Sequence, residues 1–387
     1  MKCKKTKNHN EGIYRTNRAP IDALGRPRFG VYTYPFEDVN MISGRWTLGG
    51  FPLSKQGLPL PRQICRFRLK EWQHFALVWP EGLLGFAIVD AKYLVTSWIH
   101  MVKLSSTWQE SKPGRSAIDT HVEHRRIAPP LSGVPGINQN YKIARSLWDD
   151  ETFMKKSNYS ISVQNKLSSG EHRVRLNVAS QGCKPGLTAD FKCLHDPDEI
   201  EPLVVVLPVD NNKSRGMYSH KVPLPVEGIL TIGKDRFVLE PESAFALLDV
   251  HKAHYPRRTW WNWATFAGRD EGGRSVAINL TKNVNPYDDE WNENALWVDG
   301  ELVRLSKAVF HFDAANPLDT WQIRDEGGLI DLSFHPFGER SENLNLGVLR
   351  SSFNQPFGVF KGRVKFKGDL LKIDSLPGVC ENHLACW

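Results

Sequence analysis

The sequence lacks the features that identify membrane-spanning and secreted proteins. None of its apolar runs approaches the ~18 residues that a spanning helix needs, although 41% of its 387 residues are hydrophobic. No apolar segment follows the lysines of the opening MKCKKTKNHNEG, so no secretory signal is predicted. We therefore expect a cytoplasmic protein without a membrane span, for which only peripheral contact with a membrane stays open.

Motifs for cofactors, metals and the common hydrolases are also missing. The six cysteines form no CxxC pair, and there is no GxGxxG or Walker loop, no GxSxG and no HExxH. We therefore expect neither a cofactor nor a metal. The net charge of +7 could suit nucleic acid, but the basic residues are spread along the chain without a recognition motif. Nucleic acid is accordingly not expected as a partner.

What the sequence has instead is hydrophobic alternation with a period of two. Apolar and polar residues alternate in HRVRLNVAS (172–180), GLIDLSFHPFG (328–338) and GRVKFKGDLLKI (362–373), which is typical of antiparallel strands with one solvated face. The segment PESAFALLDVHKA (241–253) also fits a strand better than a helix. We predict an all-β protein of two antiparallel barrel or sandwich domains with few short helices.

One polar segment bounded by proline separates two strand-rich halves. It reads KCLHDPDEIEP (192–202) and is followed by the apolar LVVVLPV. We predict an N-terminal domain over residues 1–198 and a C-terminal domain over 199–387 that carries the main motifs. A closed barrel of eight or more strands has room inside for one small apolar ligand.

Tryptophan is abundant, with 13 residues, and three of them fall in WWNWATFAGRD (260–270). Strand alternation places Trp261 and Trp263 on one face and Trp260 and Asn262 on the other. If the first pair faces a binding site, it forms an aromatic wall for an apolar ligand or a cation. If the second pair does so, the site is polar. Simple packing of all three indoles is the remaining alternative.

The segment just before these tryptophans carries candidate catalytic groups. Asp249 and His251 share a strand face, so the carboxylate could orient the imidazole and raise its basicity. Arg257 and Arg258 follow a turn-forming HYP and could clamp an acidic head group. The alternatives are that Asp249 caps a turn, that His251 is solvated and that the arginines are surface charge.

A second candidate cluster lies in YDDEWNENALWVDG (287–300). Its acidic residues lack the spacing of a calcium loop, so calcium is not expected. A glutamate beside Trp291 or Trp297 would be desolvated, and its raised pKa would make it a general acid. Glu293 is the candidate, against the alternative of a solvated acidic loop. Asn279, among apolar residues in VAINLTKN, must bridge strands or face a ligand.

Five segments in order carry a family resemblance: NEGIYRTNRAP, LLDVHKAHYPRRTWWNWATFAGRD, VAINLTKN, NENALWVDGELVRL and GVCENHLACW. The chain resembles an uncharacterised domain-of-unknown-function family. That family is similar to the AttH-like and carotenoid 1,2-hydratase-like proteins, which have two lipocalin-like β-domains, and to fungal lipocalin-like cyclases and Diels–Alderases. The resemblance singles out Glu293 and Asn294, which fall in the recurring ENALW.

The resemblance implies a function as well as a fold. The resemblance implies acids that protonate an alkene and aromatic rings that hold the resulting cation, as in hydratase-like relatives. Asp249, His251 and Trp263 are the nearest matches here. We therefore expect an apolar or amphipathic lipid-like or isoprenoid-like ligand in a β-barrel pocket, in the second half or between the halves. The expected chemistry is cofactor-independent hydration, isomerisation or cyclisation. A non-catalytic lipid carrier, a carbohydrate-active protein with paired carboxylates and a structural protein are the alternatives.

Overall fold

The computed structural model describes residues 19–42, 44, 67–108, 115–128, 140–211, 213, 215–346 and 349–386. These residues form two large antiparallel sheets and two short 3-10 helices, η1 (Arg115–Ala117) and η2 (Leu167–Ser169). The expected all-β fold, with two antiparallel sheets and few short helices, is confirmed. The opening segment, on which the expectation about a secretory signal rests, lies outside the described residues.

The first sheet follows the order β5-β4-β3-β2-β14-β12-β10-β9-β8-β7-β6. Three further strands lie off this path: β11 and β13 pair with β12, and β1 pairs with β11. Its strands are β1 (Gly30–Tyr32), β2 (Leu69–Trp79), β3 (Gly82–Asp90), β4 (Val95–Leu104), β5 (Ile118–Ile127), β6 (Tyr141–Lys142), β7 (Asp150–Lys156), β8 (Tyr159–Lys166), β9 (Glu171–Val178), β10 (Leu187–Leu194), β11 (Leu203–Pro208), β12 (Gly216–Ile232), β13 (Asp235–Leu239) and β14 (Phe245–His254).

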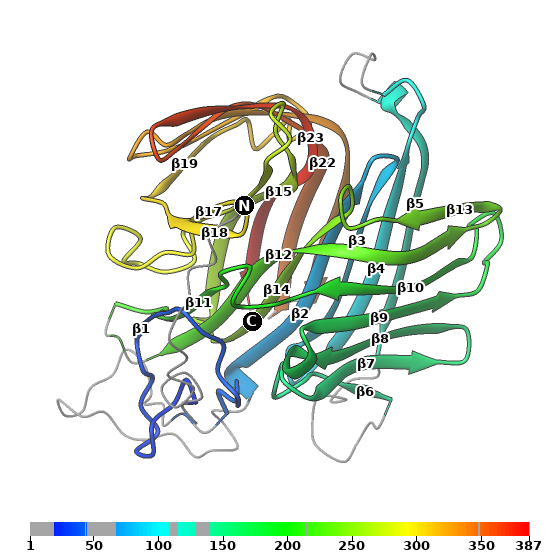
Figure 1. The fold of residues 1–387 in the computed structure, drawn as a ribbon. Coiled ribbons are helices and arrows are strands. Elements are labelled where there is room, and N and C mark those ends of the chain that lie inside the picture. The colour runs from blue at the N-terminus through cyan, green and yellow to red at the C-terminus, as the bar shows by residue number, and fades with distance from the viewer. Residues whose placement is uncertain are drawn as a thin grey trace.

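The second sheet follows the order β18-β17-β16-β15-β23-β22-β21-β20-β19. Its strands are β15 (Arg258–Arg269), β16 (Ser275–Lys282), β17 (Ala295–Val298), β18 (Glu301–Arg304), β19 (Ala308–His311), β20 (Trp321–Asp325), β21 (Ile330–Leu346), β22 (Leu349–Phe366) and β23 (Asp369–Cys386). In Figure 1 this sheet, yellow-green to red, curls over the upper left of the molecule.

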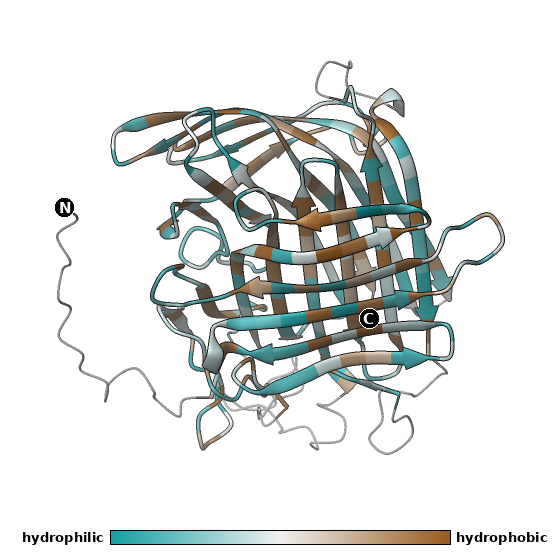
Figure 2. Cartoon of the chain, turned by 45° about the vertical axis from the view of Figure 1, so that its right-hand side comes forward, coloured by the Kyte–Doolittle hydropathy of each residue, from teal (hydrophilic) through white to brown (hydrophobic). Residues whose placement is uncertain are grey.

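Among the residues that the structure describes, alternation along the strands creates three apolar cores. One lies inside the curl of the first sheet, with Phe75 and Leu248 among its members, and another lies inside the second, with Phe266 and Phe360. The third lies between the sheets and includes Phe357. Figure 2 shows hydrophobic and hydrophilic residues alternating along the strands. Because successive side chains point to opposite faces, one strand serves two cores, and the space between the sheets is lined by both halves.

The division between the sheets does not coincide with the domain boundary expected from the sequence. The polar segment at 192–202 begins with the last three residues of β10 and leads to β11, and both strands belong to the first sheet. The chain passes to the second sheet between His254 and Arg258. The reason is the long pairing of β14 with both β2 and β12, which holds a strand from the second half of the sequence in the centre of the first sheet.

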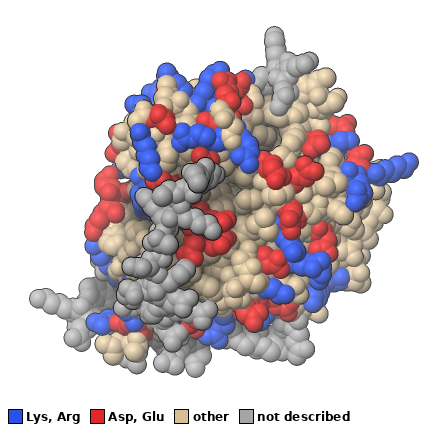
Figure 3. Space-filling model, viewed as in Figure 1, with Lys and Arg blue, Asp and Glu red and all other residues tan. Residues whose placement is uncertain are grey.

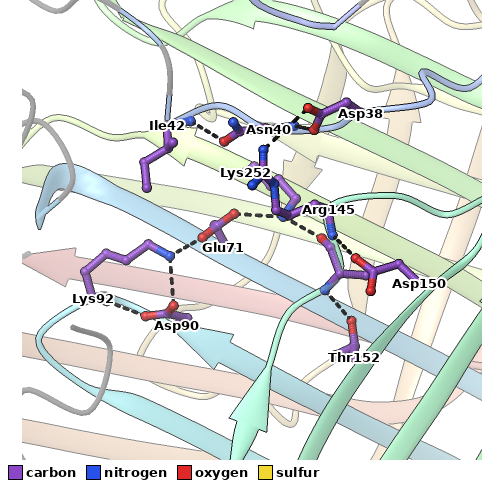
Figure 4. A network of polar contacts seen from close by, with 11 residues as sticks. Asp38, Asn40, Ile42, Glu71, Asp90, Lys92, Arg145, Asp150, Thr152 and Lys252 are labelled. Atoms are coloured by element: carbon purple, nitrogen blue, oxygen red, sulfur yellow. Dashed lines mark hydrogen bonds and ion pairs between the residues drawn. The ribbon is translucent and has the colours of Figure 1, made fainter. Parts of the chain in front are cut away.

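A buried ionic network crosses the interior of the first sheet's curl (Figure 4). Glu71 on β2 accepts hydrogen bonds from Lys92 and from Lys252 on β14, the latter at 2.7 Å. Lys92 also donates to Asp90 at 2.8 Å, and Lys252 donates to the carbonyl oxygen of Ala144 at 2.9 Å. Each charge in this network therefore has a partner of opposite sign, which is the condition for keeping buried ions charged.

The exposed surface carries both signs of charge. On the face seen in Figure 3, Lys and Arg side chains are interspersed with Asp and Glu. Arg173 and Asp190, for example, form an exposed ion pair at 3.0 Å. None of the helices in the described ranges is long and apolar enough to cross a membrane.

Candidate functional site

A cavity of about 220 Å³ lies between the two sheets. The first sheet lines it from β2, β3, β4, β5, β12 and β14, and the second from β15, β16, β21, β22 and β23. The cavity is thus on the facing surfaces of the two curled sheets, where the sequence had left open a site in the second half or between the halves. Most of its lining is apolar, and several aromatic rings and ionisable groups converge on it.

The centre of the cavity holds a lysine among carboxyl groups. The register pairs Lys221 on β12 with Asp249 on β14, and their Nζ and Oδ1 atoms are 2.8 Å apart. Lys221 Nζ is also 3.7 Å from Glu293 Oε1, in the loop before β17. Burial opposes ionisation of both acids. Lys221 outweighs it at Asp249, whose pKa is lowered, whereas the pKa of Glu293 remains raised.

His251 lies on the same face of β14 as Asp249 and is sandwiched among aromatic groups. Its ring stacks on Trp72 with centroids 4.1 Å apart and an interplanar angle of 4°. Its Nε2 atom is 2.5 Å from the hydroxyl of Tyr255. Burial lowers the pKa of His251 to about 3, so the imidazole is neutral at physiological pH. A neutral ring can exchange a hydrogen bond with Tyr255 in either direction.

Trp261 and Trp263 both face the cavity, which answers the question that alternation left open. The indole of Trp261 donates to Glu381 Oε1 at 2.8 Å, and Gln355 donates to the other carboxyl oxygen at 3.0 Å. Burial raises the pKa of Glu381 to about 7. On the opposite face of β15, Trp260 is 47% exposed and Asn262 is hydrogen-bonded to Asn382, away from the cavity.

Two buried asparagines hold the backbone around Glu293. Asn279 accepts the indole hydrogen of Trp263 at 2.7 Å and donates to the carbonyl oxygen of Glu293 at 2.7 Å. Asn294 accepts from the backbone of Thr281 and donates to that of Ser306. Neither amide lines the cavity. The two amides therefore hold the loop that carries Glu293. The sequence had instead suggested them as ligand contacts.

The arginines expected to clamp a ligand lie outside the cavity lining, but Arg258 lines a second pocket that shares Arg350 and Ser351 with the cavity. Arg257 and Arg258 are exposed and are not part of the cavity lining. A different arginine, Arg340 on β21, is buried there with its guanidinium 4.3 Å from the ring centre of Trp98 and 4.7 Å from that of Phe353. The turn after HYP directs the first pair outwards, which alternation alone does not specify.

The acidic residues at 288–290 lie outside this site. Asp289 and Glu290 have side chains that are 81% and 61% exposed, and they form only loose ion pairs with lysines. Asp288 accepts a hydrogen bond from the backbone of Asn283. Across the described residues, no group of three or more His, Cys, Asp or Glu side chains could hold a metal ion.

Sequence reasoning missed several residues of the cavity. Lys221, Tyr255, Trp72 and Arg340 line it, and nothing in their local pattern distinguished them from ordinary strand residues. Glu381 had a usable signal. In GVCENHLACW, strand alternation puts Glu381 and His383 on one face, two residues apart, in the same way that it paired Asp249 with His251.

Three solved structures can be superposed on most of this chain. A putative AttH protein from Nitrosomonas europaea has a TM-score of 0.48 and 14% identity, over 88% of this chain and 98% of that chain. Kievitone hydratase from Nectria haematococca has a TM-score of 0.47 and 11% identity, over 92% and 97%. CghA has a TM-score of 0.45 and 11% identity, over 82% and 87%. Likeness at this level concerns the overall fold at most.

The family assignment rests on a different comparison. No curated protein matches the sequence. The family model described as a domain of unknown function, DUF2804, matches residues 28–387 and so includes four of the five segments that carried the resemblance. Because the match extends over most of the 387 residues, the chain belongs to the DUF2804 family.

Proposed function

We propose that the cavity between the sheets binds an apolar or amphipathic small molecule and carries out cofactor-independent acid/base chemistry on it. The observation that carries this proposal is the opening of two protonatable carboxyl groups, Glu293 and Glu381, on one aromatic cavity. A largely apolar pocket with a few convergent polar groups of shifted pKa is the usual form of a small-molecule site.

Glu381 is the stronger candidate for the general acid. A group with a pKa of about 7 exists in both protonation states at physiological pH, so it can release a proton and take it back. Trp261 and Gln355 hold both carboxyl oxygens in place. Glu293 also has a raised pKa and is the second donor. The lowered pKa of Asp249 suits a proton acceptor or a counter-ion better than the donor role.

The remaining groups suit the handling of a developing cation. Trp72, Tyr255 and Trp261 are near-parallel, with interplanar angles of 15–22°. Aromatic faces attract positive charge, and exclusion of water strengthens that attraction. The ionised Asp249 lies in the same cavity as a second source of negative potential. In this scheme a proton leaves a carboxyl group for the ligand, and water or the ligand returns one to a carboxylate.

The first test is native mass spectrometry of the protein purified from its own host. We expect a co-purifying compound of lipid or isoprenoid type, released on unfolding. The complex is then incubated in deuterated water, and the mass of the extracted compound is followed. Reversible protonation at carbon adds deuterium, and Glu381→Gln and Glu293→Gln should slow this addition while the compound stays bound.

The matched control is Glu301→Gln, since the side chain of Glu301 is 43% exposed, pairs with Lys367 and lies outside the cavity lining. This variant should exchange as the wild type does. A compound that binds but takes up no deuterium would establish the non-catalytic carrier instead. A bound sugar would support the carbohydrate-active alternative, and a cavity that binds nothing would refute the proposal.

A further inference from the structure

The positive charges in the interior of the cavity, Lys221, Arg125 and Arg340, have carboxylate partners. Arg340 on β21 donates to Glu123 on β5 at 2.8 Å, and Arg125 on β5 is 2.7 Å from Glu342 on β21. Both pairs join the two sheets. Lys221 is paired with Asp249, as described above. Arg350 is at the solvent-exposed rim, so no interior cation in the described lining lacks a carboxylate.

The polar groups that remain for a ligand are uncharged or acidic. Glu381 accepts hydrogen bonds from Trp261 and Gln355, which are neutral donors. The three histidines of the lining, His74, His251 and His383, are neutral, because burial lowers their pKa values to about 4, 3 and 3. An anionic group in the interior of the cavity would therefore meet carboxyl groups, and the cations there are already paired with carboxylates.

We propose that the cavity selects an uncharged ligand and discriminates against a carboxylate or phosphate compound of the same shape, because its own carboxylates occupy its cations. This inference rests on the proposed function and names the ligand class for that site. A buried anion without a partner loses its hydration and gains no ion pair in return. Arg257 and Arg258, the clamp for an acidic head group that the sequence had suggested, do not line the cavity interior.

The inference can be tested with pairs of planar probes that differ only in charge. We choose 2-naphthalenemethanol against 2-naphthoate and 1-pyrenemethanol against 1-pyrenecarboxylate, with binding measured by calorimetry at about pH 8, where both acids are ionised. Each alcohol should bind the wild-type protein roughly tenfold or more tightly than its carboxylate. The ratio should shrink as the pH is lowered towards the pKa of the probe acid, because the neutral acid then becomes available.

A variant that frees Lys221 should weaken the preference for the alcohol probes if the inference is correct. Asp249→Asn leaves Lys221 without its closest carboxylate, so a carboxylate probe gains a partner and the alcohol's advantage should narrow or reverse. Asp331→Asn is the matched control, because Asp331 forms an exposed pair with Arg324 at 3.0 Å. That variant should keep the wild-type ratio.

Two outcomes contradict the inference in different ways. If the carboxylates bind the wild-type protein as tightly as the alcohols at about pH 8, the cavity is a binding site but does not select uncharged ligands. If no probe of either ring size binds, the proposed function fails and the inference fails with it. The pH series needs only the wild-type protein, so the test remains decisive if Asp249→Asn does not fold.

Discussion

Two buried charged clusters lie on opposite faces of β14 and differ in their balance of charge. Inside the first sheet, Lys252 and Lys92 are matched by Glu71 and Asp90, whereas the cavity face has Lys221 as the centre of three acids. The pKa of Glu71 is lowered to about 2, because its two lysines outweigh burial. That of Glu381 is raised to about 7, because burial is not offset by a bonded cation.

The difference separates a structural cluster from a chemical one. When each buried charge has a partner of opposite sign, the ion pairs hold the strands together. When acids outnumber cations in an enclosed site, at least one acid retains a proton that it can donate. The same strand thus supplies a fixed ion network on one face and a protonatable site on the other.

The largest expected effect comes from breaking the balanced cluster. Glu71→Gln leaves the fully buried Lys252 without its carboxylate and should lower the free energy of unfolding by about 3–5 kcal/mol at neutral pH. Because the pKa of Glu71 is lowered in the folded state, its stabilisation is present above pH 4.5 and is lost as the pH falls towards about 2. Urea unfolding measures both effects.

The control for this change is again Glu301→Gln, in which an exposed ion pair is removed. It should cost less than about 1 kcal/mol. Equal losses in the two variants would show that burial of the Glu71 network contributes nothing beyond a surface pair.

The second effect has the opposite sign with pH. Because the pKa of Glu381 is raised in the folded state, the folded protein holds this proton more firmly than the unfolded chain does. Its stability contribution is present below pH 4.5 and is lost as the pH rises through about 7. Glu381→Gln does not titrate and avoids this loss. The free energy of unfolding of the variant should therefore rise by roughly 3 kcal/mol relative to that of the wild type between acid and alkaline pH.

Denaturant unfolding of wild type and Glu381→Gln at several pH values measures that difference. A constant difference across the window between pH 4.5 and about 7 would mean that Glu381 is ionised normally in the folded protein. The two clusters would then not differ in protonation as described above.

A smaller effect distinguishes the two faces of β15. Trp261→Phe removes the hydrogen-bond donor of Glu381 and should cost about 1–2 kcal/mol. It should also raise the pKa of Glu381 further, since this bond stabilises the charged form. Trp260→Phe, on the 47% exposed face, should change stability by less than about 0.5 kcal/mol. Thermal unfolding at several pH values checks both.

The smallest effect is expected at the arginine that the sequence favoured as a clamp. Arg258 is exposed and outside the cavity lining, so Arg258→Ala should leave the affinity for 1-pyrenemethanol and 1-pyrenecarboxylate unchanged within about twofold. Calorimetric titration of both probes provides the measurement. A tenfold loss of affinity for the carboxylate alone would show that Arg258 binds the acidic group of a ligand.

Much of the local structure could be predicted because alternation depends only on neighbouring residues. The apolar positions Val174, Leu176 and Val178 are buried on β9, and the segment with Asp249 and His251 is a strand, as expected. The cavity itself was beyond such reasoning. Lys221 is next to Asp249 through the register of β12 with β14, and Glu381 meets Trp261 across 120 residues of sequence.

The sequence by itself determined the strands and the residues that share a face, since a strand repeats every two residues. It separated Trp261 and Trp263 from Trp260 and Asn262 in this way. Only the tertiary structure decided which face meets the other sheet, which charges are paired and where the cavity lies. Burial and ion pairing arise when distant strands come together, and these contacts set the pKa values on which the proposed chemistry depends.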